Sequence, residues 1–150
     1  MRRTDRESGI ETAKKILASA EYGVLSMSSK DGVPHGVPLN YAFAEDGIFF
    51  HCAPEGAKID LLSENPRVSF CAVGRTQVQP AQFATKYESV IVTGRVEELF
   101  AEDKYRGLVL LLQKYSADHM KEGLEYIAKE IDRTKVFRIR IESITGKARE

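Results

Sequence analysis

Two Asp-Gly pairs that separate apolar extended segments constrain the fold of this chain more than any other feature. Asp31–Gly32 follows the segment "YGVLSMSS", and Asp46–Gly47 precedes "IFFHCA". An Asp-Gly pair between apolar runs is a strong signal for a tight turn between antiparallel strands. The sequence therefore predicts that the extended segments at residues 22–29, 34–44 and 48–53 form an antiparallel meander.

Further apolar patterns predict three more strands and four helices. The strands are expected at residues 67–73, 89–99 and 136–143, with a bend or bulge at Gly94. Apolar residues spaced three and four positions apart predict helices over residues 8–20, 57–65, 101–115 and 117–131. Six antiparallel strands with flanking helices indicate a mainly β (α+β) fold, and a small closed barrel would remove exposed strand edges. Periodicity alone does not separate such a barrel from a β-sandwich.

Length and charge limit the class of protein. A chain of 150 residues has the usual size of one domain, so we expect residues 1–150 to form a single domain. Its 22 basic and 22 acidic residues cancel, which argues against a general nucleic-acid binder. The longest apolar run, Leu108–Leu112, is far shorter than the roughly 20 residues of a membrane helix. Without a signal-peptide pattern, and with two cysteines expected to be reduced, we expect a cytoplasmic protein.

The stretch "FFHCAPEGAKIDLL" holds polar residues where a strand passes through a Pro/Gly turn into a helix. Unpaired N–H groups at a helix start attract anions, and Lys58 adds a full positive charge there. His51 and Cys52 alternate along the strand and point to opposite faces, so they are not expected to share a metal ion. A solvated lysine and a structural histidine explain the same residues, so this stretch alone leaves a phosphate site as one of two interpretations.

Two other segments carry candidate binding groups. In "GVPLNYAF", the Asn40 amide offers a donor and an acceptor suited to the edge of a planar heterocycle, whereas Tyr41 favours core packing. In "KYESVIVTG", the Ser89 hydroxyl opens a strand, where it can contact a phosphate or serve as an ordinary turn residue.

Taken in order, four segments resemble the FMN-binding split-barrel proteins related to pyridoxamine 5′-phosphate oxidase. Within that group the chain is most similar to the 5-nitroimidazole-resistance proteins. The segments are "YGVLSMSSKDGVPHGVPLNYAF", "GIFFHCAPEGAKIDLLSENPRVSF", "YESVIVTGRVEEL" and "ITGK". The resemblance implies a six-stranded antiparallel split β-barrel with flanking helices. It also implies a homodimer with FMN at the subunit interface and a small-molecule substrate.

The resemblance also implies roles for individual residues. Lys58 and Ser89 are similar to residues at the FMN phosphate. His51 resembles the family histidine beside the isoalloxazine ring, where it would orient substrate or shuttle a proton as the catalytic residue. The remaining candidates resemble residues that line the flavin, and they are Leu39, Asn40, Tyr41 and Ala53.

The chain departs from the family pattern near its end. Ile144 stands before the final "TGK" where an aromatic residue, often Trp, is common, and the substrate-phosphate arginines of pyridoxamine phosphate oxidase are not evident. The resemblance therefore implies a flavoprotein oxidoreductase acting on a small nitroaromatic or similar acceptor rather than vitamin B6 oxidation. Two alternatives stay open: a haem-binding split-barrel protein with a histidine on the iron, and an FMN-binding module without turnover.

Overall fold

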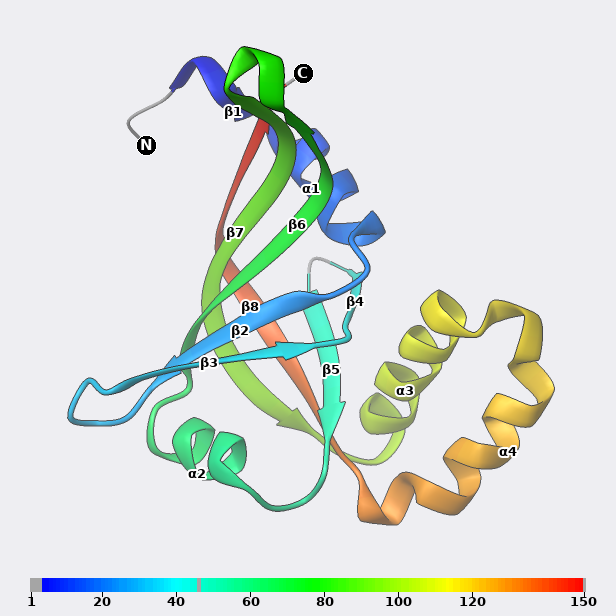
Figure 1. Cartoon of the computed structure of the whole chain (residues 1–150). Helices are drawn as coiled ribbons and strands as arrows, with labels where there is room; N and C mark the ends of the chain where they lie inside the picture. The colour runs from blue at the N-terminus through cyan, green and yellow to red at the C-terminus, as the bar shows by residue number, and fades with distance from the viewer. Residues whose placement is uncertain (1–3, 46, 150) are drawn as a thin grey trace.

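An antiparallel sheet of eight strands, flanked by four α-helices, forms the part of the chain described by the structure, which is a computed structural model (Figure 1). The described residues are 4–45 and 47–149. The strands are β1 (Glu7–Ser8), β2 (Gly23–Ser28), β3 (Pro34–Leu39), β4 (Ala42–Ala44), β5 (Gly47–Cys52), β6 (Arg67–Gln79), β7 (Ala84–Leu99) and β8 (Lys135–Arg149). The helices are α1 (Ile10–Ser19), α2 (Ala57–Glu64), α3 (Ala101–Tyr115) and α4 (Met120–Glu130).

The sheet curls round until its two ends meet. The strands follow the order β3-β2-β6-β7-β8-β5-β4, and β1 pairs with β8. β3 and β4 stand at opposite ends of this path, yet only Asn40 and Tyr41 separate them along the chain. Two residues cannot bridge an open sheet, so the sheet must close on itself with a gap between β3 and β4. The expected split β-barrel with flanking helices is confirmed, with eight strands rather than six.

The predicted three-stranded meander is wrong in its middle connection. β2 pairs with β3, and β4 pairs with β5, but β3 has no pairing with either β4 or β5 among the described residues. The segment expected as one strand breaks at Tyr41, whose side chain is fully buried and donates a hydrogen bond to the Leu17 carbonyl. This anchor turns the chain from one end of the sheet to the other. The predicted turn before β5 includes Asp46, which lies outside the described residues.

The core divides into two clusters on opposite faces of β5. Phe50 belongs to the larger cluster, which fills the barrel beneath α1. Phe49 belongs to a smaller cluster with Leu108 of α3 and Ile127 of α4. Successive side chains of a strand point to opposite faces, so β5 carries the barrel core on one side and packs against the α3–α4 pair on the other. His51 follows Phe50 along β5 and therefore points to the same face as Phe49.

Helix positions follow the sequence pattern closely. α3 has the predicted bounds, and α2 ends at Glu64, just before the Asn65–Pro66 step expected to stop it. α1 begins at Ile10 rather than at residue 8, because residues 7–8 pair with β8. α4 begins at Met120, after a 3₁₀ turn at residues 117–119. Within the described residues, no helix is both long and apolar enough to cross a membrane.

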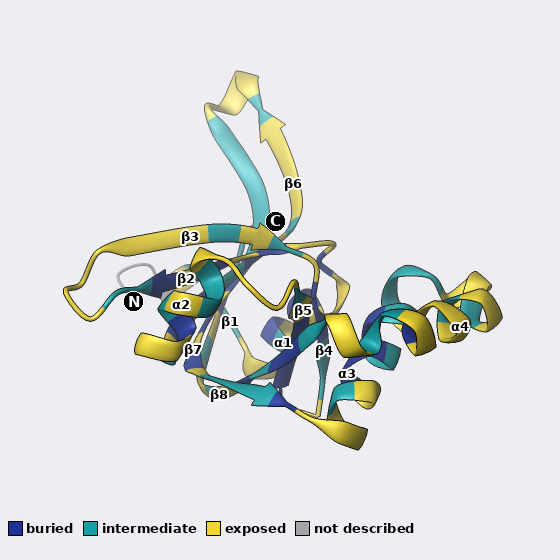
Figure 2. Ribbon diagram, turned by 90° about the horizontal axis from the view of Figure 1, so that it is seen from below, coloured by how far each residue is buried: buried dark blue, intermediate teal, exposed yellow. Residues whose placement is uncertain are grey.

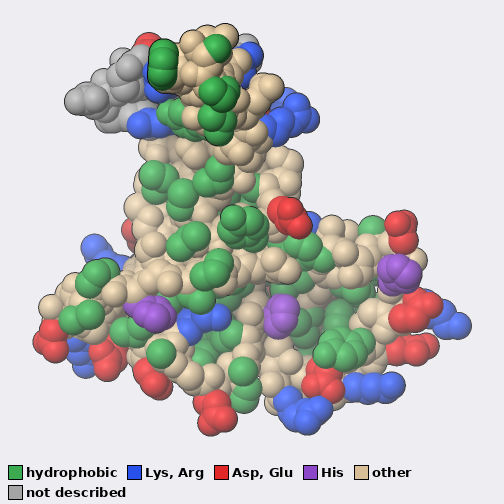
Figure 3. Space-filling view, in the orientation of Figure 1, with side chains coloured by type: hydrophobic (Ala, Val, Ile, Leu, Met, Phe, Trp, Pro, Cys, Tyr) green, Lys and Arg blue, Asp and Glu red, His purple; other side chains and the backbone are tan. Residues whose placement is uncertain are grey.

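The β6–β7 hairpin extends beyond the barrel as an arm, defined here as residues 74–88. Figure 2 shows this arm projecting from the body with an exposed tip. At the tip, the Phe83 side chain is 99% exposed and Val78 is 70% exposed. The predicted strands stop short of the arm, because both of its faces meet solvent and the sequence there lacks apolar alternation. Hydrophobic side chains are visible along the arm and at its tip in Figure 3.

The predicted irregularity at Gly94 is confirmed, and it gives a stability test. The register of β7 against β8 shifts between Thr93 and Gly94, and a Cβ at position 94 would lie 2.2 Å from the Arg140 carbonyl oxygen. Gly94→Ala should therefore lower the free energy of unfolding by about 2 kcal/mol. Gly36→Ala is the matched control, because a Cβ there meets only Val24 at 3.7 Å. Urea denaturation measures both, and equal stability of the two variants would contradict this packing argument.

Candidate functional site

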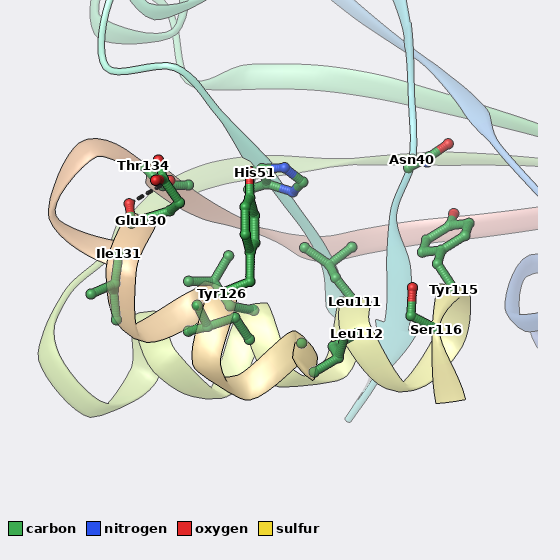
Figure 4. Close-up of a pocket in the computed structure, with 13 residues that line it drawn as sticks. Asn40, His51, Leu111, Leu112, Tyr115, Ser116, Tyr126, Glu130, Ile131 and Thr134 are labelled. Carbon is green, nitrogen blue, oxygen red and sulfur yellow. Dashed lines mark hydrogen bonds between the residues drawn. The ribbon is translucent and has the colours of Figure 1, made fainter. Parts of the chain in front are cut away.

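A cavity of about 320 Å³ lies between the end of β5 and the α3–α4 pair (Figure 4). Its apolar lining comes from both helices, including Leu111 of α3 and Ile127 of α4. Asn40 and His51 supply polar groups from the sheet side. In Figure 4, the Tyr126 ring rises from α4 toward the His51 imidazole. The cavity thus combines an apolar interior with a few polar groups, as small-molecule sites commonly do.

The β4–β5 register explains why Asn40 and His51 meet. Ala42 lies opposite Phe49 in this antiparallel ladder. Continuing the same register by two residues sets Asn40 opposite His51, just beyond the last paired residues. His51 also points to the same face as Phe49, which packs against α3 and α4. Two residues from different strands' ends, Asn40 and His51, therefore line one cavity.

The His51 imidazole is held toward its neutral form. The side chain is open to solvent on one side, but neighbouring atoms still crowd the ring. This desolvation, with a smaller contribution from the positive charge of Lys58, lowers the pKa of His51 below its usual value. A neutral imidazole has one nitrogen that donates a hydrogen bond and one that accepts, so His51 can orient an uncharged ligand.

Lys58 stands in the first turn of α2, at an open helix start. Gly56 caps this helix with φ of 127°, in the region that favours glycine, and no atom lies within 4 Å of where its Cβ would be. The space beside Gly56 is therefore open next to a half-buried lysine, and the Ile59 N–H is the first of the helix to bond the Gly56 carbonyl, at 2.9 Å. On the other face of β5, Cys52 is half-buried against the barrel core, and burial raises the pKa of its thiol.

The other predicted residues of this region differ in accessibility. Ala53 is exposed just after β5. Leu39 ends β3 and packs partly against the barrel core. Tyr41 is 0% exposed and its backbone N–H donates to the Tyr115 hydroxyl, so it supports the neighbouring Asn40 rather than presenting groups of its own. Asn40 and His51 are thus the two predicted residues that share the cavity, while Lys58 acts on His51 from the adjacent helix start.

Ser89 lies far from these groups within one chain. It pairs with Lys147 on β8, whereas Leu99, ten residues further along β7, pairs with Val136. Val136 in turn pairs with His51. Ten strand residues span about 33 Å at roughly 3.3 Å per residue. Ser89 can therefore join the groups around His51 only as part of a second copy of the chain.

The sequence reasoning missed the half of the cavity that the helices supply. The apolar spacing predicted the two helices but not the cavity between them, and Leu108 and Ile127 on those helices pack in the core. Tyr126 is the informative exception, because it is 67% exposed although it directly precedes the buried Ile127. An aromatic residue beside, rather than on, the buried face of a helix was the available signal.

Comparison with known proteins settles the family. The family model described as pyridoxamine 5′-phosphate oxidase matches residues 10–148. The chain belongs to the pyridoxamine 5′-phosphate oxidase family. The resemblance found in the sequence is therefore confirmed. Among curated proteins, no sequence matches this family member.

Three solved structures show what this family member is similar to. A FAD-binding protein from Mesorhizobium loti is 28% identical, with a TM-score of 0.69, over 97% of this chain and 98% of that chain. A candidate 5-nitroimidazole antibiotic resistance protein from Bacteroides thetaiotaomicron is 22% identical, with a TM-score of 0.76, over 93% and 84%. A FAD and haem binding protein from Mycobacterium smegmatis is 17% identical, with a TM-score of 0.84, over 97% and 74%.

The influence of Lys58 on His51 can be measured directly. Lys58→Met removes the positive charge and keeps a side chain of similar length. The pKa of His51 should therefore rise toward its usual value of about 6.5. The rise should be partial, because burial is the larger cause of the lowered pKa. Proton NMR titration of the imidazole Cε1–H signals measures it, with the signals of His35 and His119 as internal references. An unchanged His51 titration would show that Lys58 does not act on this ring.

Proposed function

We propose that this protein binds FMN at the junction of β5 and α2. A dimer of the protein, carrying this flavin, would reduce a small nitroaromatic or similar acceptor. The observation that carries the proposal is the placement of Lys58 at the open start of α2, beside His51, which borders an apolar cavity. The family and the 28% identical FAD-binding protein support a flavin as the ligand. A bound flavin would supply the electron-transfer chemistry.

The start of α2 fits the phosphate of a flavin nucleotide. An anion there would accept hydrogen bonds from the first N–H groups of the helix and meet the ammonium of Lys58. The open space around Gly56 lets a ligand approach the backbone without a steric obstacle. FAD carries the same proximal phosphate, so titration with FMN and with FAD distinguishes the two nucleotides.

The sheet edge beside the cavity fits the ring end of the flavin. The Asn40 amide would donate and accept hydrogen bonds at the polar edge of a planar ring. His51 would orient the acceptor and hold or release a proton at an imidazole nitrogen. Leu39 and Ala53 lie close to these two residues in sequence and would contribute apolar contacts, and the buried Tyr41 would hold Asn40 in place.

A second copy of the chain would complete the site. Ser89 can reach the Lys58 region only from another subunit, given its distance along β7. The exposed Val78 and Phe83 of the arm offer apolar surface that association of two copies can bury. We therefore propose a homodimer in which Lys58 of one copy and Ser89 of the other bind the same phosphate.

The proposal is tested first by flavin retention. After incubation with FMN and removal of the excess, the native protein should keep flavin absorbance. Lys58→Ala should weaken FMN binding about tenfold to a hundredfold, as expected for loss of a charged hydrogen bond of about 1.5–3 kcal/mol. Lys30→Ala, in the exposed β2–β3 turn, is the matched control.

Three other results would count against this function. Failure of the native protein to keep any flavin would overturn it. A Soret band after haem addition would instead support the haem-binding alternative. One protein of similar fold is described as binding both FAD and haem. FMN that stays bound but is never reduced by a nicotinamide donor would support the module without turnover.

The shared phosphate site is tested by mixing two defective subunits. Lys58→Ala and Ser89→Ala homodimers should each retain less FMN than the native protein. In a mixed dimer, one site carries both substitutions, but the other combines the intact Lys58 of one copy with the intact Ser89 of its partner. Co-expression should therefore regain part of the FMN retention, measured by absorbance of dimers isolated with two affinity tags. Retention no better than in either parent would contradict a site shared in this way.

A further inference from the structure

We propose that the cavity between α3, α4 and His51 is the acceptor site, and that it selects uncharged, flat aromatic molecules of one or two rings. The acceptor role rests on the proposed function, because electrons must reach this cavity from a bound flavin. The binding selectivity rests on the cavity alone. The volume of about 320 Å³ stands at the small end of ligand pockets, roughly 300–1,000 Å³, which favours a small ligand.

The interior of the cavity is suited to an apolar ring. Leu108, Leu111 and Ile127 line it and are themselves at least nine-tenths buried, so they form a fixed wall. Leu112 and the Tyr126 ring form the more accessible side. Aliphatic walls facing the Tyr126 ring favour a flat ligand, because it can stack on the ring while covering the aliphatic surface.

The charges around the cavity disfavour anions. Among the described lining residues, Glu130 carries the one permanent charge, and its two carboxylate oxygens accept hydrogen bonds of 2.8 and 3.0 Å from Arg133. No lysine or arginine is among the described residues that line the cavity, and His51 is held toward its neutral form. An anionic ligand would lose its hydration shell without gaining a cationic partner, which is costly.

Polar groups at the mouth remain available to a neutral ligand. The Tyr115 hydroxyl is bonded to backbone atoms of Tyr41 and Glu21, and the Thr134 hydroxyl donates to the Glu130 carbonyl at 2.8 Å. Within residues 4–45 and 47–149, the side chains of Asn40 and His51 have no hydrogen-bond partner, and Figure 4 shows them at the sheet side of the cavity. His51 can therefore donate to a nitro or carbonyl oxygen of the acceptor, while Asn40 stays available to the edge of the flavin ring.

Gly123 provides a way to reshape the cavity without touching its polar groups. A Cβ at position 123 would lie 2.2 Å from Leu112 Cδ1, so an alanine must push the Leu112 side chain aside. The two residues face each other between α4 and α3, and both line the cavity. Gly123→Ala should preserve the fold, because alanine stabilises a helix interior by about 1 kcal/mol relative to glycine.

The test uses flavin-free protein and two probes of nearly equal size. Equilibrium dialysis should show 4-nitrotoluene binding at least about tenfold tighter than 4-nitrobenzoate, because only the second carries a charge. Gly123→Ala should weaken 4-nitrotoluene binding at least about fivefold, and Gly36→Ala should leave it unchanged. The chain has six tyrosines and no tryptophan, so quenching of tyrosine emission gives a second readout.

The outcomes separate this inference from the proposed function. Equal binding of the two probes, or no effect of Gly123→Ala, would overturn the selectivity even if FMN is retained. Displacement of 4-nitrotoluene by FMN would overturn the acceptor assignment, because the flavin would then occupy the cavity. With FMN bound, Gly123→Ala should raise the KM for 4-nitrotoluene while FMN retention stays at the native level. Selective 4-nitrotoluene binding without any FMN retention would leave the cavity as a binding site and refute the flavin function.

Discussion

The site depends on how Tyr41 anchors the short step between the two ends of the sheet. Its buried hydroxyl donates to the Leu17 carbonyl of α1, and its backbone N–H donates to the Tyr115 hydroxyl of α3 at 3.0 Å. The Tyr115 hydroxyl has one proton, and its closest acceptor is the Glu21 carbonyl at 2.6 Å. One residue thus fixes the closure of the barrel relative to both helices. Asn40, immediately before it, is held at the cavity as a result.

Lys114 reinforces the same junction at an energetic cost. Its Nζ lies 3.8 Å from the centroid of the Tyr41 ring and donates to the Ala20 carbonyl at 2.8 Å, near the end of α1. Burial lowers the pKa of this ammonium to about 8, which shows that the fold disfavours its charged form. The cation–π contact and the hydrogen bond offset part of that desolvation. The carboxyl end of α3 is therefore held against α1. The cavity wall formed by α3 is fixed to the barrel as well as packed against α4.

These anchors explain which features the sequence could predict. The bounds of α3 follow from local apolar spacing, and Lys58 and His51 stand out where a strand meets a helix start. The break at Tyr41 depends on partners on α1 and α3, and no local pattern encodes them. The arm was missed because strands exposed on both faces lack apolar alternation. The role of Tyr126 was not predicted, because apolar spacing in the sequence indicates which face of a helix is buried but not where a cavity lies beside that face.

The alternation of side chains along β5 places the barrel core on one face of the strand and the cavity with His51 on the other. Phe50 and Cys52 face the barrel core, whereas Phe49 and His51 face α3 and α4. The strand then leads through the Gly56 turn to the positive charge of Lys58. A charged imidazole would be repelled by Lys58 and would bring a second charge to the edge of an apolar cavity. Burial and Lys58 both favour the neutral ring, so His51 can lie between the positive charge of Lys58 and an apolar cavity without adding a second charge there.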